Sequence, residues 1–411
     1  MSSTGAEDVR GPGGSRSSPG TGGVRPVLAG TTANLAVVTL FAWSLVSDDL
    51  AADVGMSRDA AAAVFAGAIV VFTATVLLTG AAERRYGPRL LLSWAALAAG
   101  AGLLVAGTAD GPVALWSGIA VLFGAANGLA YGVATGLAAR APATRRGIAT
   151  GAVVSAYAAG PVVLGFTAPA VLRAVEWRSA LIGLGLVVAA LLLLAARLAP
   201  AGAALHRSPR DRRQRVPLGV VVLWWLVFAG GTAPGLMLFA HAAPLAIDLR
   251  LSPRAAGTAV SALAVGNLTG RLLAGWWSDR IGRLPALGVA LGAAAVSVGV
   301  LVVAAAPVTV LAAFLGTGWG YGAVSALVPA ATADRVGAEA FPLAYGRIFT
   351  GWGFAGLLAP VAGGAIFMLR ADHPAAVWLV ALPLLPAAVA LLVVVRRGPG
   401  KPSGELRTWP C

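Results

Sequence analysis

The segment GRLLAGWWSDRIGR, residues 270–283, joins an apolar run to a cluster of charges. Asp279, Arg280 and Arg283 suit the aqueous end of a membrane helix. Arg271 does not, because it lies eight residues before Asp279, roughly 12 Å along a helix axis. A central arginine costs about 2.5–3.5 kcal/mol on insertion scales and tends to face a wet cavity. Snorkelling to the interface is the alternative, but the depth is large for it, so the segment predicts a membrane helix with a functional cation.

The whole chain has the composition of a membrane protein. Of its 411 residues, 58% are hydrophobic and 11% are charged, and its mean hydropathy is +0.83. A soluble domain needs a larger charged surface. The net charge of +14 does not indicate nucleic-acid binding, because the basic residues lie in short loops between apolar runs.

No pattern indicates catalysis or a bound cofactor. The one cysteine, Cys411, excludes an internal disulfide and a cysteine-based metal site. HExxH, GxSxG and P-loop patterns do not occur. We therefore expect no enzyme activity, no catalytic residue, no metal and no cofactor.

Twelve apolar runs are long enough to cross a bilayer core, which takes roughly 20 residues per helix. Their approximate bounds are 27–46, 60–81, 89–108, 112–138, 147–171, 179–198, 217–246, 254–277, 284–305, 308–333, 341–369 and 375–395. The runs at 217–246 and 341–369 contain Gly and Pro, so we expect kinks in them. The sequence predicts an all-α integral membrane protein.

Polar segments divide the chain. Residues 1–26, rich in Gly, Ser, Pro and Arg, predict a disordered cytoplasmic tail. A cytoplasmic linker at 199–216 separates an N-terminal half, 27–198, from a C-terminal half, 217–395. Residues 396–411 form a second cytoplasmic tail.

The basic residues predict how the bundle sits in the membrane. With both termini in the cytoplasm, 22 of the 30 basic residues fall in cytoplasmic segments and six in the opposite loops. The other two, Arg271 and Arg347, fall within spans. By the positive-inside rule, we expect a multi-pass protein of the cytoplasmic membrane with both termini inside the cell.

The two halves repeat each other. Ser57 and Ser252 each precede an apolar run, as helix N-caps do, and they are 195 residues apart. The same spacing separates Gly80 from Gly275 and Gly87 from Gly282. The repeat predicts two six-helix halves in the same orientation, with a binding site between them.

The most specific motif lies between the eighth and ninth spans. Its residues Gly275, Asp279, Arg280, Gly282 and Arg283 resemble the signature of the major facilitator superfamily. The first-half copy, GAAERRYGPR (80–89), keeps Gly80, Arg85, Gly87 and Arg89, but Arg84 occupies the aspartate position and Glu83 comes one residue early.

Further segments resemble the oxalate/formate antiporter and monocarboxylate porter branch of that superfamily. They are AWS (42–44), RYGPR (85–89), RRGIATG (145–151), GLMLFAHAAPLA (235–246), YGAVSALVPAATADRVG (321–337) and AYGRIFTGWGFAGLLAP (344–360). In that branch an arginine just before the signature binds the substrate carboxylate, and Arg271 matches it. The acidic partner of proton-coupled porters is Asn267 here. The lysine that oxalate exchangers use as a second cation aligns with Trp352.

The resemblance therefore implies a secondary transporter that moves a small organic anion by alternating access. Of the organic anions, it favours a monocarboxylate over a dicarboxylate. The transporter's partners would be the anion, protons or a counter-anion, and the lipid bilayer, and we expect a monomer. The alternatives are an exporter of hydrophobic drug-like compounds from the same superfamily and, outside the transporters, a transport-dead membrane sensor.

Other polar residues in the spans are candidates for the substrate site. Asn267 shares a helix face with Arg271, at a spacing of four residues. His241 is a candidate proton carrier, and hydrogen-bonded packing is an equally good interpretation. Asn127, Tyr131, Tyr157, Tyr321 and Trp352 could line the cavity, although packing between helices explains each of them alone.

The signature charges suggest a gate. Asp279 sits at the C-terminal end of a helix, where a negative charge needs a compensating partner. A partner on another helix would latch the cytoplasmic side in one state and release it in the other. Arg347 is a candidate member of this gate through Asp334 or Asp279, and snorkelling explains it equally well.

Overall fold

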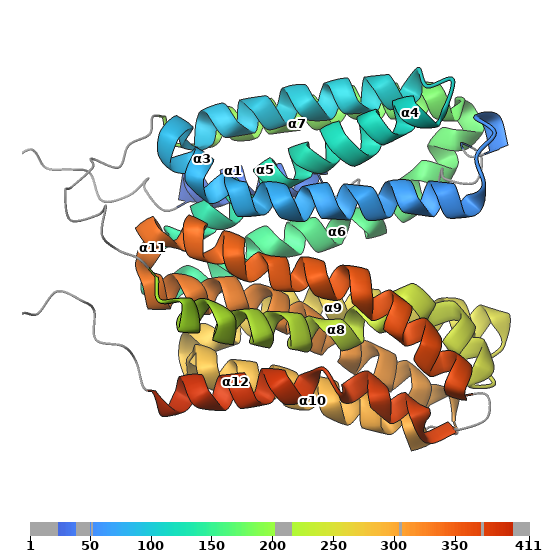
Figure 1. Cartoon of the computed structure of the whole chain (residues 1–411), viewed down its shortest axis with the longest axis vertical. Helices are drawn as coiled ribbons and strands as arrows, with labels where there is room; N and C mark the ends of the chain where they lie inside the picture. The colour runs from blue at the N-terminus through green and yellow to red at the C-terminus, as the bar shows by residue number, and fades with distance from the viewer. Residues whose placement is uncertain are drawn as a thin grey trace, which may run out of the picture.

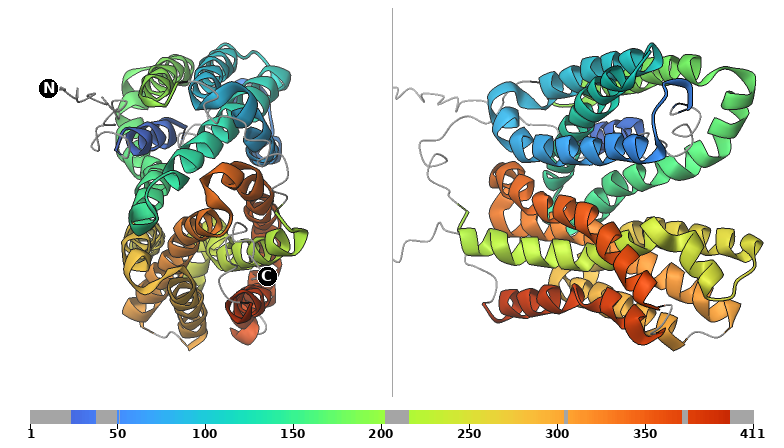
Figure 2. Two further views of the ribbon diagram at one scale, coloured as in Figure 1. Left: turned by 90° about the vertical axis from the view of Figure 1, so that its left-hand side faces the viewer. Right: turned by 45° about the vertical axis from the view of Figure 1, so that its right-hand side comes forward.

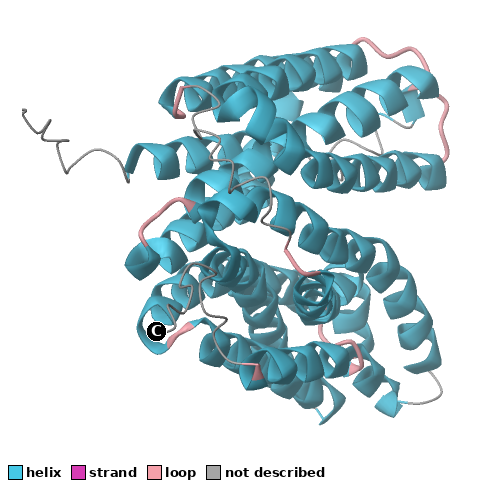
Figure 3. Ribbon diagram, turned by 60° about the vertical axis from the view of Figure 1, so that its left-hand side comes forward, coloured by secondary structure: helices cyan, strands magenta, loops and turns pink. Residues whose placement is uncertain are grey.

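The computed structural model describes residues 24–37, 50, 52–201, 216–303, 306–370 and 374–397. The regular elements in these ranges are helices (Figure 3). They are α1 (Val24–Val37), α3 (Arg58–Gly107), α4 (Pro112–Leu115), η2 (Trp116–Phe123), α5 (Gly124–Ala139), η3 (Ala143–Arg145), α6 (Arg146–Ala174), α7 (Trp177–Leu198), α8 (Leu218–Asp248), α9 (Pro253–Ile281), α10 (Arg283–Val303), α11 (Pro307–Arg370), η5 (Pro374–Ala381) and α12 (Leu384–Arg396).

The described part of each of the twelve predicted spans is largely helical. Two helices hold two spans each, because the chain reverses at Gly87 within α3 and at Gly337 within α11. Among the described residues, seven helices are long and apolar enough to cross a membrane, and both doubled helices are among them. The first span, 27–46, is described only as far as Val37. The tails, the AWS motif at 42–44 and most of the linker lie outside the described residues.

The helices form two groups that lie side by side. Helices α1 to α7 make one group and α8 to α12 the other (Figures 1 and 2). These are the two six-helix halves that the repeat predicts. Helix α8 begins and α12 ends at the same end of the bundle, where α3 and α11 also turn back (Figure 1). Glu83 beside the turn of α3, Asp279 at the end of α9 and Arg283 at the start of α10 lie at this end, which we name the signature end.

The repeated landmarks have repeated structural roles. Ser57 and Ser252 each cap a helix, since the side chain accepts from the backbone N–H three residues later, at 3.2 and 3.3 Å. Gly87 and Gly282 both turn the chain with a positive φ, of 77° and 92°. A side chain is strained in that conformation, so the turn requires glycine.

The predicted kink in the span 217–246 lies at His241, whose φ of −124° and ψ of 16° are not helical. Pro234 and Pro244 flank it within α8 and remove helical hydrogen bonds. The span 112–138 is not one regular helix, because the π-helical segment η2 separates α4 from α5. Periodicity gives no sign of such a segment.

At the opposite end of the bundle, α7 is tied to the residues before α3. The indole N–H of Trp177 donates to Asp53 at 2.9 Å, and Arg178 pairs with the same carboxylate. The donation from Trp177 and then that from Arg178 hold the pKa of the Asp53 carboxyl below its usual range.

Close helix contacts join the two halves at the signature end. A Cβ on Gly80 of α3 would collide with the backbone of Pro342 in α11, and a Cβ on Gly275 of α9 with the backbone of Gly147 in α6. Small residues let membrane helices approach this closely. The third pair of landmarks, Gly80 and Gly275, therefore marks two places where helices of opposite halves come into close contact.

We expect Gly275→Val to open the signature end, because its side chain cannot fit against the Gly147 backbone. The matched control is Gly288→Val in α10, where a Cβ meets nothing within 4 Å. In a Cys411→Ser background, nitroxide labels on cysteines introduced at Thr144 and Ala340 report the distance between the halves by double electron–electron resonance. Gly275→Val should lengthen this distance and Gly288→Val should not. An unchanged distance in Gly275→Val would contradict the close contact.

Candidate functional site

Arg271 lies in the interior, between the two halves. Only 5% of it is exposed. Its Nε donates to Asn267 Oδ1 at 2.9 Å, one helical turn earlier on α9, and its Nη1 donates to the backbone carbonyl of Val154 in α6 at 3.0 Å. Arg271 of the C-terminal half thus contacts α6 of the N-terminal half, and both of its hydrogen-bond acceptors, Asn267 and Val154, are neutral.

Two further predicted residues join Arg271 from the same half. Its guanidinium carbon lies 5.6 Å from the ring centre of Tyr321, within cation–π range. The Tyr321 hydroxyl accepts from the indole N–H of Trp352 at 3.2 Å. Both aromatic residues belong to α11 and are buried. The structure therefore brings Asn267, Arg271, Tyr321 and Trp352 together.

The N-terminal half contributes a second group of polar residues to the centre. The Tyr157 hydroxyl of α6 donates to Asn127 Oδ1 of α5 at 3.3 Å. The Tyr131 hydroxyl lies 3.4 Å from that of Tyr345 in α11, so this contact also crosses between the halves. The Tyr131 and Tyr157 rings are in edge contact, 5.2 Å apart.

Sequence reasoning misses three aromatic residues of this region: Phe72 in α3, and Tyr345 and Phe349 in α11. The ring of Phe72 lies 5.4 Å from that of Phe349 and 5.8 Å from that of Trp352, across the boundary between the halves. In an apolar run, such residues carry no signal that separates them from ordinary core residues. The Val154 carbonyl, a backbone atom, has no sequence signal at all.

His241 is not part of this group. Its Nε2 lies 2.8 Å from the carbonyl oxygen of Pro360 in α11, and its ring packs against Phe367. A carbonyl only accepts hydrogen bonds, so Nε2 carries the proton. The contact ties the kink of α8 to α11 within one half, as expected of a hydrogen-bonded packing residue.

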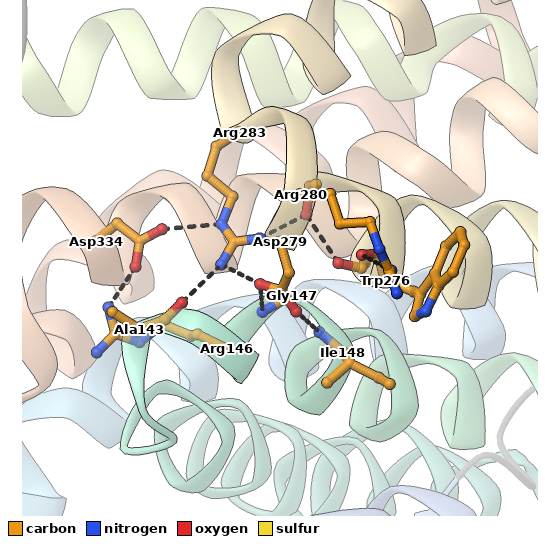
Figure 4. Close-up of polar contacts among 11 residues, drawn as sticks. Ala143, Arg146, Gly147, Ile148, Trp276, Asp279, Arg280, Arg283 and Asp334 are labelled. Atoms are coloured by element: carbon orange, nitrogen blue, oxygen red, sulfur yellow. Dashed lines mark hydrogen bonds and ion pairs between the residues drawn. The ribbon is translucent and has the colours of Figure 1, made fainter.

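The signature motif forms a charge cluster that joins the halves (Figure 4). Asp279 accepts from the backbone N–H groups of Gly147 and Ile148, both at 2.9 Å, at the start of α6. Arg283 pairs with Asp279 at 2.6 Å. Because helix N-termini carry partial positive charge, this position compensates the Asp279 carboxylate.

Asp334 of α11 extends the cluster. It accepts from Arg283 Nε at 2.8 Å and pairs with Arg146 of α6. Arg280 points elsewhere, with its guanidinium 3.7 Å from the ring centre of Trp276. Asp279 and Asp334 are thus paired with Arg283 and Arg146, whereas Arg347 is exposed.

The first-half copy of the motif is arranged differently. Arg84, in the aspartate position, is exposed. Glu83 is buried and pairs with Arg140 at the end of α5, at 2.7 Å, within its own half. Arg85 stacks on Tyr86, and Arg89 donates to three backbone carbonyls at the end of α7, those of Ala196, Arg197 and Ala199.

A family model described as "Major Facilitator Superfamily" matches residues 27–243 and 223–409. The chain belongs to the major facilitator superfamily. This facilitator is a multi-pass membrane transporter of the secondary type and not an enzyme.

Two curated relatives align with most of this facilitator. The mouse protein named Monocarboxylate transporter 11 is 30% identical over 337 residues, which cover 79% of this chain and 72% of that protein. The oxalate:formate antiporter of Oxalobacter formigenes is 24% identical over 371 residues, or 87% and 88% of the two chains.

Solved structures of the superfamily share the fold. The proton:xylose symporter XylE superposes with a TM-score of 0.69 at 16% identity, over 91% of this chain and 95% of the other. FucP in its outward conformation superposes with a TM-score of 0.67 at 14% identity, over 91% of this chain and 98% of the FucP chain. At such identities the similarity establishes the arrangement of helices and nothing about substrate.

Proposed function

We propose that this facilitator carries a small organic anion with one carboxylate across the cytoplasmic membrane by alternating access, and that Arg271 binds the carboxylate. The observation that carries the proposal is a buried arginine between the halves whose partners, Asn267 and Val154, are neutral. None of the ion pairs among the described residues involves it.

A cation at this depth favours an anionic ligand. An unpaired charge in the membrane interior is costly, and an anion that enters with its own charge relieves that cost. The guanidinium presents a planar fork of donors that matches a carboxylate in bidentate geometry. In the part of the chain that the structure describes, Glu83 is the one buried acid, and it pairs with Arg140.

The bond to Val154 links ligand binding to the movement of the halves. The guanidinium that would bind the carboxylate is also the group that joins α9 to α6, through Nη1. Nη1 has two N–H groups, so a carboxylate can share this donor with the carbonyl or displace the carbonyl. In both cases a bound anion alters a contact between the halves and therefore their relative stability, as ligand-driven transport requires.

The signature end faces the cytoplasm in this proposal. Most basic residues fall in its loops, as the positive-inside rule requires. The charge cluster around Asp279 and Asp334 then acts as the cytoplasmic latch, with Gly80 and Gly275 as the close-contact points. Arg347, being exposed, is left as a snorkelling residue or as a gate residue of another state.

The names of the relatives agree with an anion, one being a monocarboxylate transporter and the other an oxalate:formate antiporter. A monocarboxylate fits better than a dicarboxylate, because Arg271 is the one buried basic side chain among the described residues. Uptake of labelled mono- and dicarboxylates into proteoliposomes, with and without a pH gradient, tests this proposal. Absence of any saturable carboxylate flux would overturn it.

The coupling partner is a proton or a counter-anion, and His241 is the candidate proton carrier if protons are used. Its bond to Pro360 favours a packing role, so we expect His241→Gln to keep the response of uptake to an inward acid gradient. We expect His241→Ala to lose about 1 kcal/mol of stability, the usual worth of a hydrogen bond. Loss of the gradient response in a stable His241→Gln protein would instead assign it the proton.

The second candidate is an exporter of hydrophobic compounds, which the aromatic side chains around Phe72 and Phe349 favour. Retained transport of neutral compounds by Arg271→Gln, without competition from anions, would support it. Flux of any substrate in vesicles excludes the transport-dead sensor.

A further inference from the structure

We infer that the transported anion is an aromatic monocarboxylate, in which a flat ring is attached directly or through one carbon to the carboxylate. This inference rests on the proposed function, since it takes Arg271 as the carboxylate site and adds what surrounds the rest of the substrate. The evidence is a group of six buried side chains that we name the aromatic cluster: Phe72, Tyr131, Tyr157, Tyr321, Phe349 and Trp352.

The aromatic cluster is one connected group of rings beside Arg271. Phe72 is stacked with Tyr157 at a centroid distance of 6.1 Å, and Phe349 with Trp352 at 5.2 Å. The guanidinium of Arg271 lies over the ring of Tyr321, and the Tyr321 hydroxyl accepts a hydrogen bond from Trp352. The guanidinium thus lies at the edge of this group of packed rings.

Two members of the aromatic cluster, Tyr157 and Phe349, lie at nearly the same depth as Arg271. Arg271 is ten residues from the end of α9, or roughly 15 Å from the signature end at 1.5 Å per residue. Tyr157 is 11 residues from the start of α6, and Phe349 is 12 residues beyond the turn at Gly337, which gives roughly 16–18 Å. A carboxylate on Arg271 places the remainder of a small molecule among these rings.

The hydroxyl groups of the cluster are already engaged in hydrogen bonds within the protein. The hydroxyl of Tyr321 accepts from Trp352, that of Tyr157 donates to Asn127, and that of Tyr131 contacts Tyr345. A second carboxylate or several hydroxyl groups would lose water here without a matching cation among the described residues. A ring with no further polar groups loses little and gains contact with ring faces and edges.

Several ring contacts join opposite halves. Phe72 of the N-terminal half touches Phe349 and Trp352 of the C-terminal half, and Tyr131 touches Phe349 at 5.1 Å. These contacts break when the halves move apart. An aromatic substrate can replace them with ring contacts of the same kind, whereas an aliphatic or highly hydroxylated body cannot.

The test is equilibrium binding to the purified full-length chain, with labelled benzoate and labelled lactate as parallel probes. Unlabelled benzoate, phenylacetate, cyclohexanecarboxylate, lactate and oxalate are the competitors. We expect benzoate and phenylacetate to bind at least about 10-fold more tightly than lactate, since a buried ring adds apolar area. Cyclohexanecarboxylate, with equal charge and a puckered ring, should bind more weakly than benzoate.

The outcomes separate this inference from the proposed function. If lactate or oxalate binds as tightly as benzoate and Arg271→Gln abolishes that binding, the aromatic class is wrong and the carboxylate site stands. If no carboxylate shows binding that depends on Arg271, the proposed function fails.

Variants of the aromatic cluster give a second test of the substrate class. Phe349→Leu and Phe72→Leu should reduce the preference for benzoate over lactate by about 2- to 10-fold, the range of an aromatic pair contact. The control is Phe314→Leu, a fully buried ring of α11 outside the cluster, which should leave the preference unchanged. If a cluster variant fails to fold, the competition on the wild-type protein still decides. An unchanged preference in folded Phe349→Leu and Phe72→Leu would overturn the inference.

Discussion

Arg271→Gln should reduce carboxylate uptake into proteoliposomes by raising KM about 100-fold or more. Each hydrogen bond to a charged partner contributes about 1.5–3 kcal/mol, and a bidentate pair has two of them. Glutamine keeps a hydrogen-bond donor that can reach Asn267, so the contact within α9 survives while the positive charge is lost. Arg271→Lys should recover part of the uptake, because it restores the charge but not the fork.

The control for this variant is Arg396→Gln at the end of α12, where the side chain is exposed. It removes one positive charge from the protein without touching the centre, and its KM should match the wild type. Wild-type uptake in Arg271→Gln would show that the buried cation is structural. The proposed carboxylate site would then be abandoned.

Asp279→Asn should shift the facilitator away from the state in which the signature end is closed. The carboxylate accepts two backbone N–H groups of α6 and pairs with Arg283. Loss of its charge weakens all three contacts, by about 2–3 kcal/mol in total, which is roughly a 30- to 150-fold change in the ratio of closed to open molecules. Nitroxide labels at Thr144 and Ala340 should show a longer distance component.

Asp110→Asn is the matched control, since Asp110 is exposed at the opposite end of the bundle. Its distance distribution should equal that of the wild type. If Asp279→Asn also left the distribution unchanged, the contacts of Asp279 would hold the motif together locally without controlling the halves.

The architecture could be read from the sequence because membrane helices follow from length and apolar composition. The repeat of Ser57, Gly80 and Gly87 could be read as well, because all three recur at one constant spacing. These positions are the caps, close contacts and turns of both halves. Local chemistry fixes the caps and the turns, whereas the close contacts of Gly80 and Gly275 depend on how the two halves pack.

The candidate site could be predicted only in part. Arg271 and Asn267 share a helix face, and helical spacing alone predicts their contact. The partners of Asp279 and Arg271 on α6 are backbone atoms, which every residue has. The aromatic cluster consists of side chains that equally suit an ordinary core. Its members are far apart in the sequence, and only the packing of helices brings them together.

The central claim is that Arg271 holds the substrate carboxylate between the two halves. Solid-state NMR of the reconstituted full-length protein, with 15N-labelled arginine and a 13C-carboxyl monocarboxylate at saturation, tests it most directly. The account predicts dipolar coupling between a guanidinium and the carboxylate carbon at about 4 Å, and its loss in Arg271→Gln. A bound carboxylate without this coupling, or coupling that persists in Arg271→Gln, would contradict it.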